Sequence, residues 1–371
     1  MKNKFLVILA AALAFVGCRG TQDEPTPDVG GEVEIIEGAV SLTIDRSMIQ
    51  SNGSDYATLR LYVTDANGMV HDVTEDADLY VSGDATPLAS SQFTTTTPAD
   101  YEIYAIYGLA VSDKVKVTAV DGLIDLPEDK GGSEFAHRIL LVQHTGTDCP
   151  NCPRLMTALK ALSEDSDYAS RYYHVASHSY NNDDPAYSNA AVLLSSSFCS
   201  GYYPDLTYNL SRLGAMEDAS LNSIKSRIDE LQSPYAAVGI SASVTHKDGK
   251  LYINAEVKSV VQNDFRLAIW VLEDEIYGRQ SGATDSWQNT HENALRAMYG
   301  SGLAAQIYGE SIGKLKAEQK VKRIFSMDCN DGWNIENCKV LLIVTSPRGE
   351  NFELENSIVC PVGESVEYAY N

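Results

Sequence analysis

Two closely spaced cysteines are the residues of this sequence best suited to chemistry. Cys149 and Cys152 form a C-x-x-C motif between a continuous apolar run and a stretch of helical periodicity. A thiolate at a helix N-terminus is favoured by the positive end of the helix dipole and by free amide donors, so its pKa falls. Cys152 could then resolve a mixed disulfide formed by Cys149. The motif predicts thiol–disulfide exchange if the Cys149 sulfur is open to solvent. The alternative is a disulfide that stays oxidised and staples a loop.

The elements around the motif alternate between strand and helix. Residues 139–142 are all apolar, which is typical of a strand buried on both faces. Apolar residues then recur at helical spacing between Leu155 and Leu162. Asp183 and Asp184 precede a predicted inserted helix and are expected to provide its cap and its first-turn charge. The remaining predictions are strands at 172–177 and 206–210 and helices at 185–197 and 218–231.

The order of elements around the motif resembles the thioredoxin-like superfamily. It consists of a strand, a C-x-x-C, a helix and a later Tyr203-Pro204 before a further strand. The resemblance implies a cis bond before Pro204, with the backbone of Tyr203 and Pro204 ready to pair with an extended substrate. It also implies that Cys149 and Cys152 are the catalytic pair. Asp148 adjoins Cys149, and its negative charge would raise the pKa of the thiol.

Four further cysteines follow the motif in the mature chain. Cys338 and Cys360 are equally spaced about Gly349 in a predicted hairpin, which could place them opposite each other. The rival pairing is Cys329–Cys338, and connectivity cannot be read from sequence. Cys199 lies shortly before Tyr203-Pro204 and is either an inert thiol or a third participant near the dithiol.

Other chemistries find less support. A structural zinc site needs four ligands, and neither a second C-x-x-C nor a pair of histidines supplies them, so no metal site and no cofactor are predicted. His291-Glu292 lacks the second histidine of a zinc-protease helix. Three aromatic residues of the C-terminal third could form a binding surface or pack in a core: Trp287, Tyr299 and Tyr308.

The N-terminus carries an export signal. Lys2 and Lys4 precede an apolar run over residues 5–15 that is too short to span a bilayer, and small Gly17 is followed by Cys18. This ending resembles a bacterial lipobox, which implies cleavage after residue 17 and lipidation of Cys18. The predicted signal peptide is therefore 1–17. The Gly-, Pro- and acid-rich residues 18–38 are predicted to form a tether. Within it, Gln22-Asp23-Glu24 resembles the acidic signals that send Bacteroidetes lipoproteins to the outer face of the outer membrane.

Strand patterns flank the central region. Alternating apolar and polar residues over 40–120 predict an immunoglobulin-like sandwich at 39–125. Alternation returns after Pro234 and predicts a C-terminal β-sandwich at 235–371, leaving 134–233 for the thioredoxin-like domain. Residues 276–306 interrupt the C-terminal strands as a long polar and aromatic excursion, which is either a functional loop or a flexible one.

Composition limits the class of partner. The 371 residues carry a formal net charge of −23, with 44% hydrophobic and 21% charged residues. A chain of this length suits roughly two to three domains with sizeable cores. The acidic balance repels phosphate backbones, so nucleic acid is not an expected partner.

The whole order of segments resembles the Bacteroidetes outer-membrane lipoproteins related to the twenty-eight-kilodalton outer membrane protein. The residues that carry this resemblance are 146–153, 201–204, and Glu273-Asp274 followed by the His291 region. It implies a multidomain α/β plus all-β chain, with a thioredoxin-like α/β domain flanked by two immunoglobulin-like β-sandwiches. It also implies a surface-exposed protein anchored in membrane lipid through Cys18. Two functions stay open, thiol–disulfide exchange on exported proteins and non-catalytic binding of exported or host proteins by an adhesin or receptor.

Overall fold

The computed structural model of the chain describes residues 40–211 and 220–371. The predicted signal peptide 1–17, Cys18 and the tether 18–38 lie outside the described residues. No helix within the described ranges is both long and apolar enough to cross a membrane.

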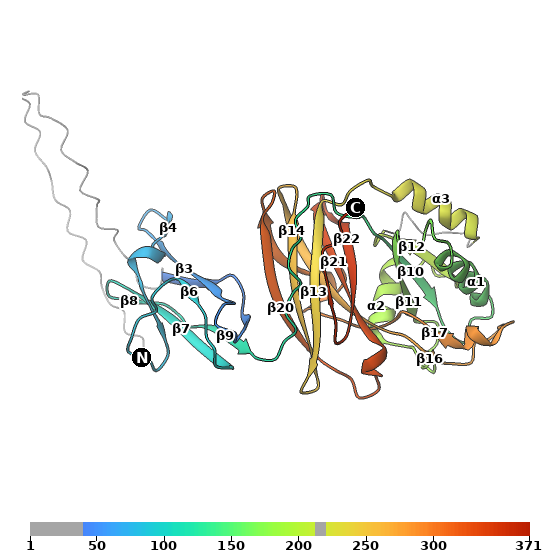
Figure 1. Cartoon of the computed structure of the whole chain (residues 1–371), viewed down its shortest axis with the longest axis horizontal. Coiled ribbons are helices and arrows are strands. Elements are labelled where there is room, and N and C mark those ends of the chain that lie inside the picture. Colours follow the sequence, from blue (N-terminus) through green and yellow to red (C-terminus); the bar gives the residue numbers. More distant parts are fainter. Residues whose placement is uncertain (1–39, 212–219) are drawn as a thin grey trace, which may run out of the picture.

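The N-terminal part is a sandwich of two sheets at one end of the molecule (Figure 1). One sheet has the order β1-β3-β4 with β6 paired to β3, and the other has the order β2-β9-β7-β5 with β8 paired to β7. Leu59 and Leu61 of β3 and Ile103 of β7 meet in one core, as the alternating pattern predicts. The immunoglobulin-like assignment stays a prediction. The elements are β1 (Val40–Ile44), β2 (Met48–Gln50), β3 (Ala57–Thr64), β4 (Val70–Asp72), η1 (Thr74–Asp76), β5 (Asp78–Val81), β6 (Gln92–Phe93), β7 (Ala99–Tyr107), β8 (Ala110–Val111) and β9 (Val115–Val120).

One mixed sheet of eight strands runs through the rest of the chain, in the order β12-β10-β11-β18-β15-β21-β22 with β19 paired to β15. The strands β10, β11 and β18 are parallel neighbours, whereas the other pairs are antiparallel. Strands from both sides of residue 234 belong to this one sheet. The domain boundary expected there therefore does not separate two sheets. The strands are β10 (Ile139–Thr145), β11 (Tyr172–His178), β12 (Asp205–Tyr208), β15 (Asn263–Glu273), β18 (Ala294–Met298), β19 (Glu310–Leu315), β21 (Cys338–Arg348) and β22 (Asn351–Pro361).

A four-stranded sheet, β20-β14-β13-β23, covers one face of the C-terminal half of that sheet. Its inward side chains, such as Ile240 and Ile253, pack against Ile269 of β15 and Leu342 of β21. Lys322 of β20 forms an ion pair with Asp55 of the N-terminal sandwich at 3.2 Å. The strands are β13 (Val238–Lys247), β14 (Lys250–Ser259), β20 (Lys320–Asp328) and β23 (Ser365–Val366).

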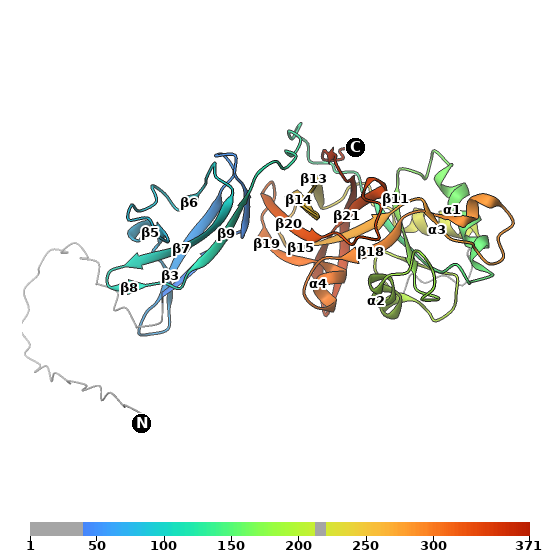
Figure 2. The same ribbon diagram turned by 90° about the horizontal axis from the view of Figure 1, so that it is seen from below.

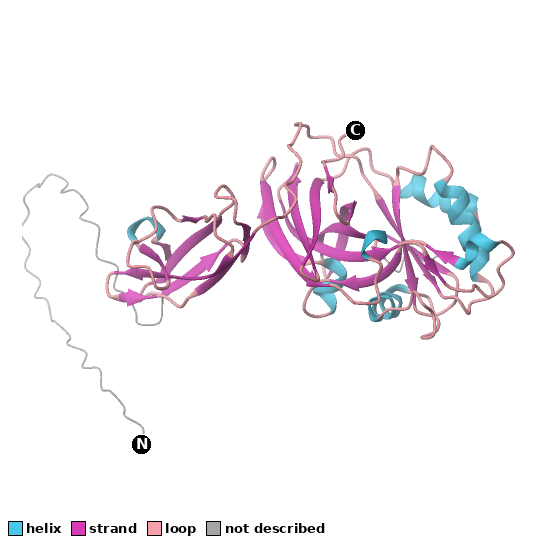
Figure 3. Ribbon diagram, turned by 60° about the horizontal axis from the view of Figure 1, so that its bottom comes forward, coloured by secondary structure: helices cyan, strands magenta, loops and turns pink. Residues whose placement is uncertain are grey.

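Helices cover both faces of the other half of the mixed sheet (Figure 3). In β10, Ile139 and Leu141 pack with α1 and α3, whereas Leu140 and Val142 pack with α2 on the opposite face. All seven residues of β10 are buried, which confirms the prediction of a strand covered on both faces. The helices are α1 (Cys152–Ser163), α2 (Asn189–Phe198), α3 (Leu221–Leu231) and α4 (Leu303–Tyr308).

The inserted helix begins later than predicted. Residues 185–197 were expected to be helical, but α2 begins at Asn189, and the Ser188 hydroxyl caps it by accepting the Ala191 N–H at 3.0 Å. The prediction that Asp183 and Asp184 provide the cap and first-turn charge of this helix is therefore wrong, since the helix begins five residues after Asp184. Downstream, the predicted strand at 206–210 is β12 and ends at Tyr208.

The excursion over residues 276–306 contains several short elements of its own. After β16 it runs beside α1 and returns to enter the mixed sheet as β18 (Figure 2). It is therefore built into the fold. The short elements of this region and of the loop before β21 are β16 (Ile276–Tyr277), η3 (Ser286–Asn289), β17 (Thr290–His291) and η4 (Ile335–Asn337).

Candidate functional site

The two motif cysteines form a closed disulfide. Cys152 is the first residue of α1, and Asn151 is the residue before that helix. Cys149 lies in the turn that follows β10, where its backbone N–H donates to the Gly146 carbonyl at 3.1 Å. The motif was predicted to lie between a buried strand and the start of a helix, and it does so, with its second cysteine as the first helical residue and Cys149 in the preceding turn.

The disulfide is closed off from solvent. Cys149 is 1% exposed and Cys152 is 0% exposed. The condition under which the motif predicts exchange, a Cys149 sulfur open to solvent, is therefore not met. Residues 278–289, which we name the cover segment, lie across the turn that carries Cys149.

Hydrogen bonds tie the cover segment to the motif. The Gln280 side-chain amide donates to the carbonyls of Cys149 at 3.0 Å and Thr147 at 3.1 Å, with a longer contact to Gly146 at 3.3 Å. The Ser281 N–H donates to the Thr147 carbonyl at 2.7 Å. At the other end, the Gln288 amide donates to the Pro153 carbonyl at 3.2 Å. Buried carbonyls need donors, and the cover segment provides them.

A glycine permits the close approach between the two segments. Gly282 has a φ of +72°, and a Cβ added there would lie 2.3 Å from the Pro150 carbonyl oxygen. Any side chain would therefore be strained by the backbone and would collide with the main chain of the motif. The cover segment can lie against the C-x-x-C because residue 282 has no side chain.

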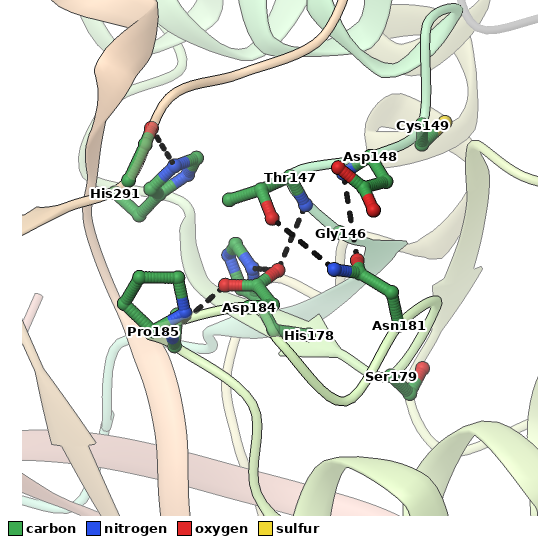
Figure 4. A network of polar contacts seen from close by, with 12 residues as sticks. Gly146, Thr147, Asp148, Cys149, His178, Ser179, Asn181, Asp184, Pro185 and His291 are labelled. Carbon is green, nitrogen blue, oxygen red and sulfur yellow. Dashed lines mark hydrogen bonds and ion pairs between the residues drawn. The ribbon is translucent and has the colours of Figure 1, made fainter.

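Beneath the motif lies a buried carboxylate (Figure 4). Asp184 accepts the Thr147 N–H at 2.8 Å and a hydrogen bond from His178 Nδ1 at 2.7 Å, and its other oxygen accepts the Ala186 N–H. Burial acts to raise the pKa of Asp184, but the bonds from His178, Ala186 and Thr147 outweigh it and hold that pKa below its ordinary value. The carboxylate anchors the turn after β10 to the end of β11.

His291 extends this polar cluster towards the excursion (Figure 4). Its ring meets that of His178 edge-on, with the centroids 4.8 Å apart. Its Nε2 donates to the Gly278 carbonyl at 3.0 Å. Burial, and next the neighbouring His178, lower the pKa of His291 to about 4. Sequence patterns assigned no role to His178 or Gln280. The one sequence signal that could have pointed to this cluster is a histidine, His178, at the end of a buried strand.

Tyr203 and Pro204 lie at the same sheet edge as the motif. The Tyr203–Pro204 bond is cis, as the sequence resemblance implies. Asp205 pairs with His144 in the antiparallel β10–β12 ladder, so the residues before β12 adjoin the turn after β10. The Tyr203 hydroxyl lies 3.0 Å from the Ser179 hydroxyl. Substrate pairing by this backbone stays a prediction.

The remaining cysteines are free thiols within the described chain. The proposed Cys338–Cys360 pair is not formed, because the hairpin register places Val340 opposite Cys360. The turn already pairs Arg348 with Asn351, which is not symmetric about Gly349, and the bulge between Val344 and Thr345 shifts the ladder by one further residue. Cys329–Cys338 is not formed either. Burial raises the pKa of both Cys338 and Cys360 to about 12.

Cys199 is a free thiol and takes no part in the disulfide. Its Sγ contacts the Tyr202 carbonyl at 3.5 Å. Burial is the main cause that raises the pKa of its thiol. A raised pKa reduces the thiolate fraction, which favours the inert interpretation over a third participant.

The three aromatic residues of the C-terminal third divide between core and cavity. Tyr299 packs edge-on against Phe325, and Tyr308 packs against Phe198 and Phe352. Trp287 instead lines a cavity beside α1. In the described ranges, no group of three or more His, Cys, Asp or Glu side chains is arranged to hold a metal ion.

The fold and the site thus define a β-rich protein in which a covered C-x-x-C disulfide joins a central parallel strand to a helix. No family model and no curated protein sequence matches the chain. Among solved structures, the chain is similar to HBP35 of Porphyromonas gingivalis, with a TM-score of 0.52 and 15% identity over 63% of this chain and 77% of that chain. This similarity shows a related fold.

Two other solved structures share smaller likenesses. A domain of the outer membrane lipoprotein Omp28 from Porphyromonas gingivalis matches with a TM-score of 0.24 and 16% identity, over 35% of this chain and 92% of that chain. A DUF3823 family protein from Bacteroides ovatus matches with a TM-score of 0.21 and 8% identity, over 77% of this chain and 86% of that chain. Scores at this level carry no argument about fold or function.

Proposed function

We propose that this chain is an outer-membrane lipoprotein whose thioredoxin-like domain is a non-catalytic scaffold, stapled by Cys149–Cys152. The observation that carries the proposal is the 1% exposure of Cys149 beneath the cover segment. Exchange requires a thiolate to reach one sulfur of the disulfide, so access governs the reaction. With both cysteines buried to this extent, a thiolate reaches either sulfur only when the structure around the motif opens.

The thioredoxin-like assignment rests on the local order of elements. The strands β12-β10-β11 lie side by side, with α1 and α3 on one face and α2 on the other. The C-x-x-C joins β10 to α1, and Pro204 precedes β12. In this chain the sheet continues through β18 into the C-terminal strands, so the domain is fused to its neighbour.

Location is proposed from the sequence. Lys2, Lys4 and the apolar run before Cys18 support export and acylation of the Cys18 thiol. Several acyl chains on one residue would anchor the protein stably, since each buried methylene contributes about 0.8 kcal/mol. The partners we propose are membrane lipid through Cys18 and exported or host proteins that bind the surfaces of the sandwiches. The charge of −23 argues against nucleic acid.

Thiol–disulfide exchange is the competing function, and it requires the cover segment to move away from the Cys149 carbonyl. The two functions differ in what a reductant does to the folded protein. We expect Cys149–Cys152 to resist dithiothreitol under native conditions and to be reduced once urea unfolds the chain. Alkylation followed by peptide mass spectrometry distinguishes these two cysteines from the four free thiols at Cys199, Cys329, Cys338 and Cys360.

An insulin-reduction assay provides the test of catalysis. We expect the wild type and the Cys149→Ser variant to give the same background rate. Turnover that depends on Cys149 would refute the scaffold proposal and establish exchange. Ser226→Ala, at an exposed position of α3, serves as a control for the effect of substitution on a helix of the same domain.

A further inference from the structure

A cavity lies beside α1, separate from the sulfur atoms. Its volume is about 510 Å³, and its walls come from β10, β11, α1 and the residues from η3 to Asn293. Pockets that hold small organic ligands in proteins have volumes of about 300–1,000 Å³. The cavity is therefore large enough for one such molecule.

Part of the cavity wall is apolar and aromatic. Met156 and Leu159 line it from α1, Tyr172 lines it from β11, and Trp287 lines it from η3. The Lys160 ammonium lies 5.5 Å from the centroid of the Trp287 ring, which supports the position of that ring. A ligand with a flat or apolar body would bury that body against these side chains.

Another part of the cavity wall carries a chain of hydrogen bonds with a defined direction. His174 Nε2 lies 3.1 Å from Gln143 Oε1, and since a carbonyl oxygen only accepts, the histidine donates. His174 Nδ1 then accepts from the Asn293 amide at 3.4 Å. This chain orients the Gln143 amide and occupies its oxygen.

The nitrogen of the same amide is left without a partner. Gln143 is 3% exposed, it lines the cavity, and its Nε2 makes no hydrogen bond in the described structure. Buried donors without acceptors are rare, because water is no longer available to them. A hydrogen-bond acceptor bound inside the cavity would satisfy the unpaired N–H groups of Gln143.

Two of the histidines in the cavity wall are uncharged near pH 7. Burial lowers the pKa of His174 and of His291 to about 4, so both rings are neutral near pH 7. Lys160 also lines the cavity, and its ammonium is paired with the Glu164 carboxylate at 2.7 Å. Burial, and next the charge of Asp274, raise the pKa of Glu292. The neutral histidines offer an anionic ligand no counter-charge, and the Lys160 ammonium is already paired with Glu164.

We propose that this cavity binds an uncharged, largely apolar small molecule whose carbonyl oxygen accepts a hydrogen bond from Gln143 Nε2. The apolar body lies between Met156 and Trp287, and the carbonyl points to the sheet. This site is a second property of the protein and does not depend on whether Cys149–Cys152 exchanges.

Dye titration of the full mature chain, prepared without acylation, tests the proposal. Nile red is uncharged and carries a ring carbonyl, pyrene is uncharged without an acceptor, and anilinonaphthalene sulfonate is anionic. We expect Nile red to bind saturably at one site per chain with a blue shift, and the anionic dye to bind at least tenfold more weakly. Several unsaturable sites, or equal affinity for the anionic dye, would overturn the proposal.

Substitutions then locate the dye. Met156→Trp fills the cavity from a half-buried position of α1 and should abolish Nile red binding, whereas Ser226→Trp on the exposed face of α3 should leave it unchanged. Gln143→Leu should weaken Nile red roughly five- to tenfold and leave pyrene unaffected, because one hydrogen bond is lost. Unchanged Nile red binding to Met156→Trp would refute the site. Equal losses for Nile red and pyrene in Gln143→Leu would refute the role of the amide.

Discussion

The Gln280→Ala substitution tests the cause of the closed disulfide. Gln280 is 3% exposed, and its amide supplies donors to the carbonyls of Cys149 and Thr147. A typical hydrogen bond contributes roughly 0.5–1.5 kcal/mol, and a buried carbonyl left without a donor adds to the loss. Losing both bonds should lower the free energy of opening the cover segment by about 2–3 kcal/mol. That change corresponds to roughly a 30- to 150-fold increase in the open population.

The rate of reduction measures this opening. When the closed state re-forms faster than the reductant reacts, the rate of reduction is proportional to the open population. We therefore expect dithiothreitol to reduce Cys149–Cys152 roughly 30- to 150-fold faster in Gln280→Ala than in the wild type, at fixed pH and temperature. Peptide mass spectrometry after alkylation gives the reduced fraction at each time.

The control separates local opening from global instability. Gln92→Ala removes an exposed glutamine from β6 in the N-terminal sandwich and should leave the rate of reduction unchanged. Urea unfolding of each variant reports the global free energy. Reduction of Gln280→Ala at the wild-type rate would show that the cover segment is held by other contacts. Reduction of the wild type as fast as a short C-x-x-C peptide would show that the disulfide is not covered in solution.

Three further predictions concern the same features. Gly282→Ala should lower the melting temperature and speed reduction of the disulfide, because the added Cβ would collide with the Pro150 carbonyl. Calorimetry and the reduction assay measure these two effects, and unchanged values would contradict the close approach. The folded-state pKa of His174 and of His291 is lowered from 6.5 to about 4, so the unfolded state takes up more protons between these values. Their contribution to stability is then fully present above about pH 6.5 and is lost as the pH falls towards 4. Urea unfolding at pH 7 and pH 5 should detect this loss of unfolding free energy, and the His291→Gln variant should show a smaller loss. Cys18→Ser should abolish incorporation of labelled palmitate and release the protein from the membrane fraction, and retained label would exclude the lipid anchor at this position.

Local sequence patterns predict most of the individual elements. Residues 139–142 are apolar at every position, and a strand covered on both faces needs this property. Alternation in β3 predicts which side chains enter the core, because successive residues of a strand point to opposite faces. Each of these signals depends only on neighbours in the chain.

The predictions that failed required knowledge of distant partners. Asp184 precedes an apolar pattern and so looks like a helix cap, yet its carboxylate binds the Thr147 N–H, 37 residues away. Symmetry about Gly349 suggested that Cys338 and Cys360 lie opposite each other, but the turn is centred between Gly349 and Glu350, and the bulge after Val344 changes the register by one more residue. A bulge of this kind leaves no periodic signal in the sequence.

The sequence by itself determined that two thiols lie between a buried strand and a helix, within reach of a disulfide bond. Only the tertiary structure decided that this disulfide is closed to solvent. The Cys149 carbonyl finds its donor on Gln280, 131 residues further along the chain. A glutamine in a long polar excursion shows no pattern that would predict this contact. The contact forms because buried carbonyls must be paired and because the folded sheet brings residues 278–289 over the motif.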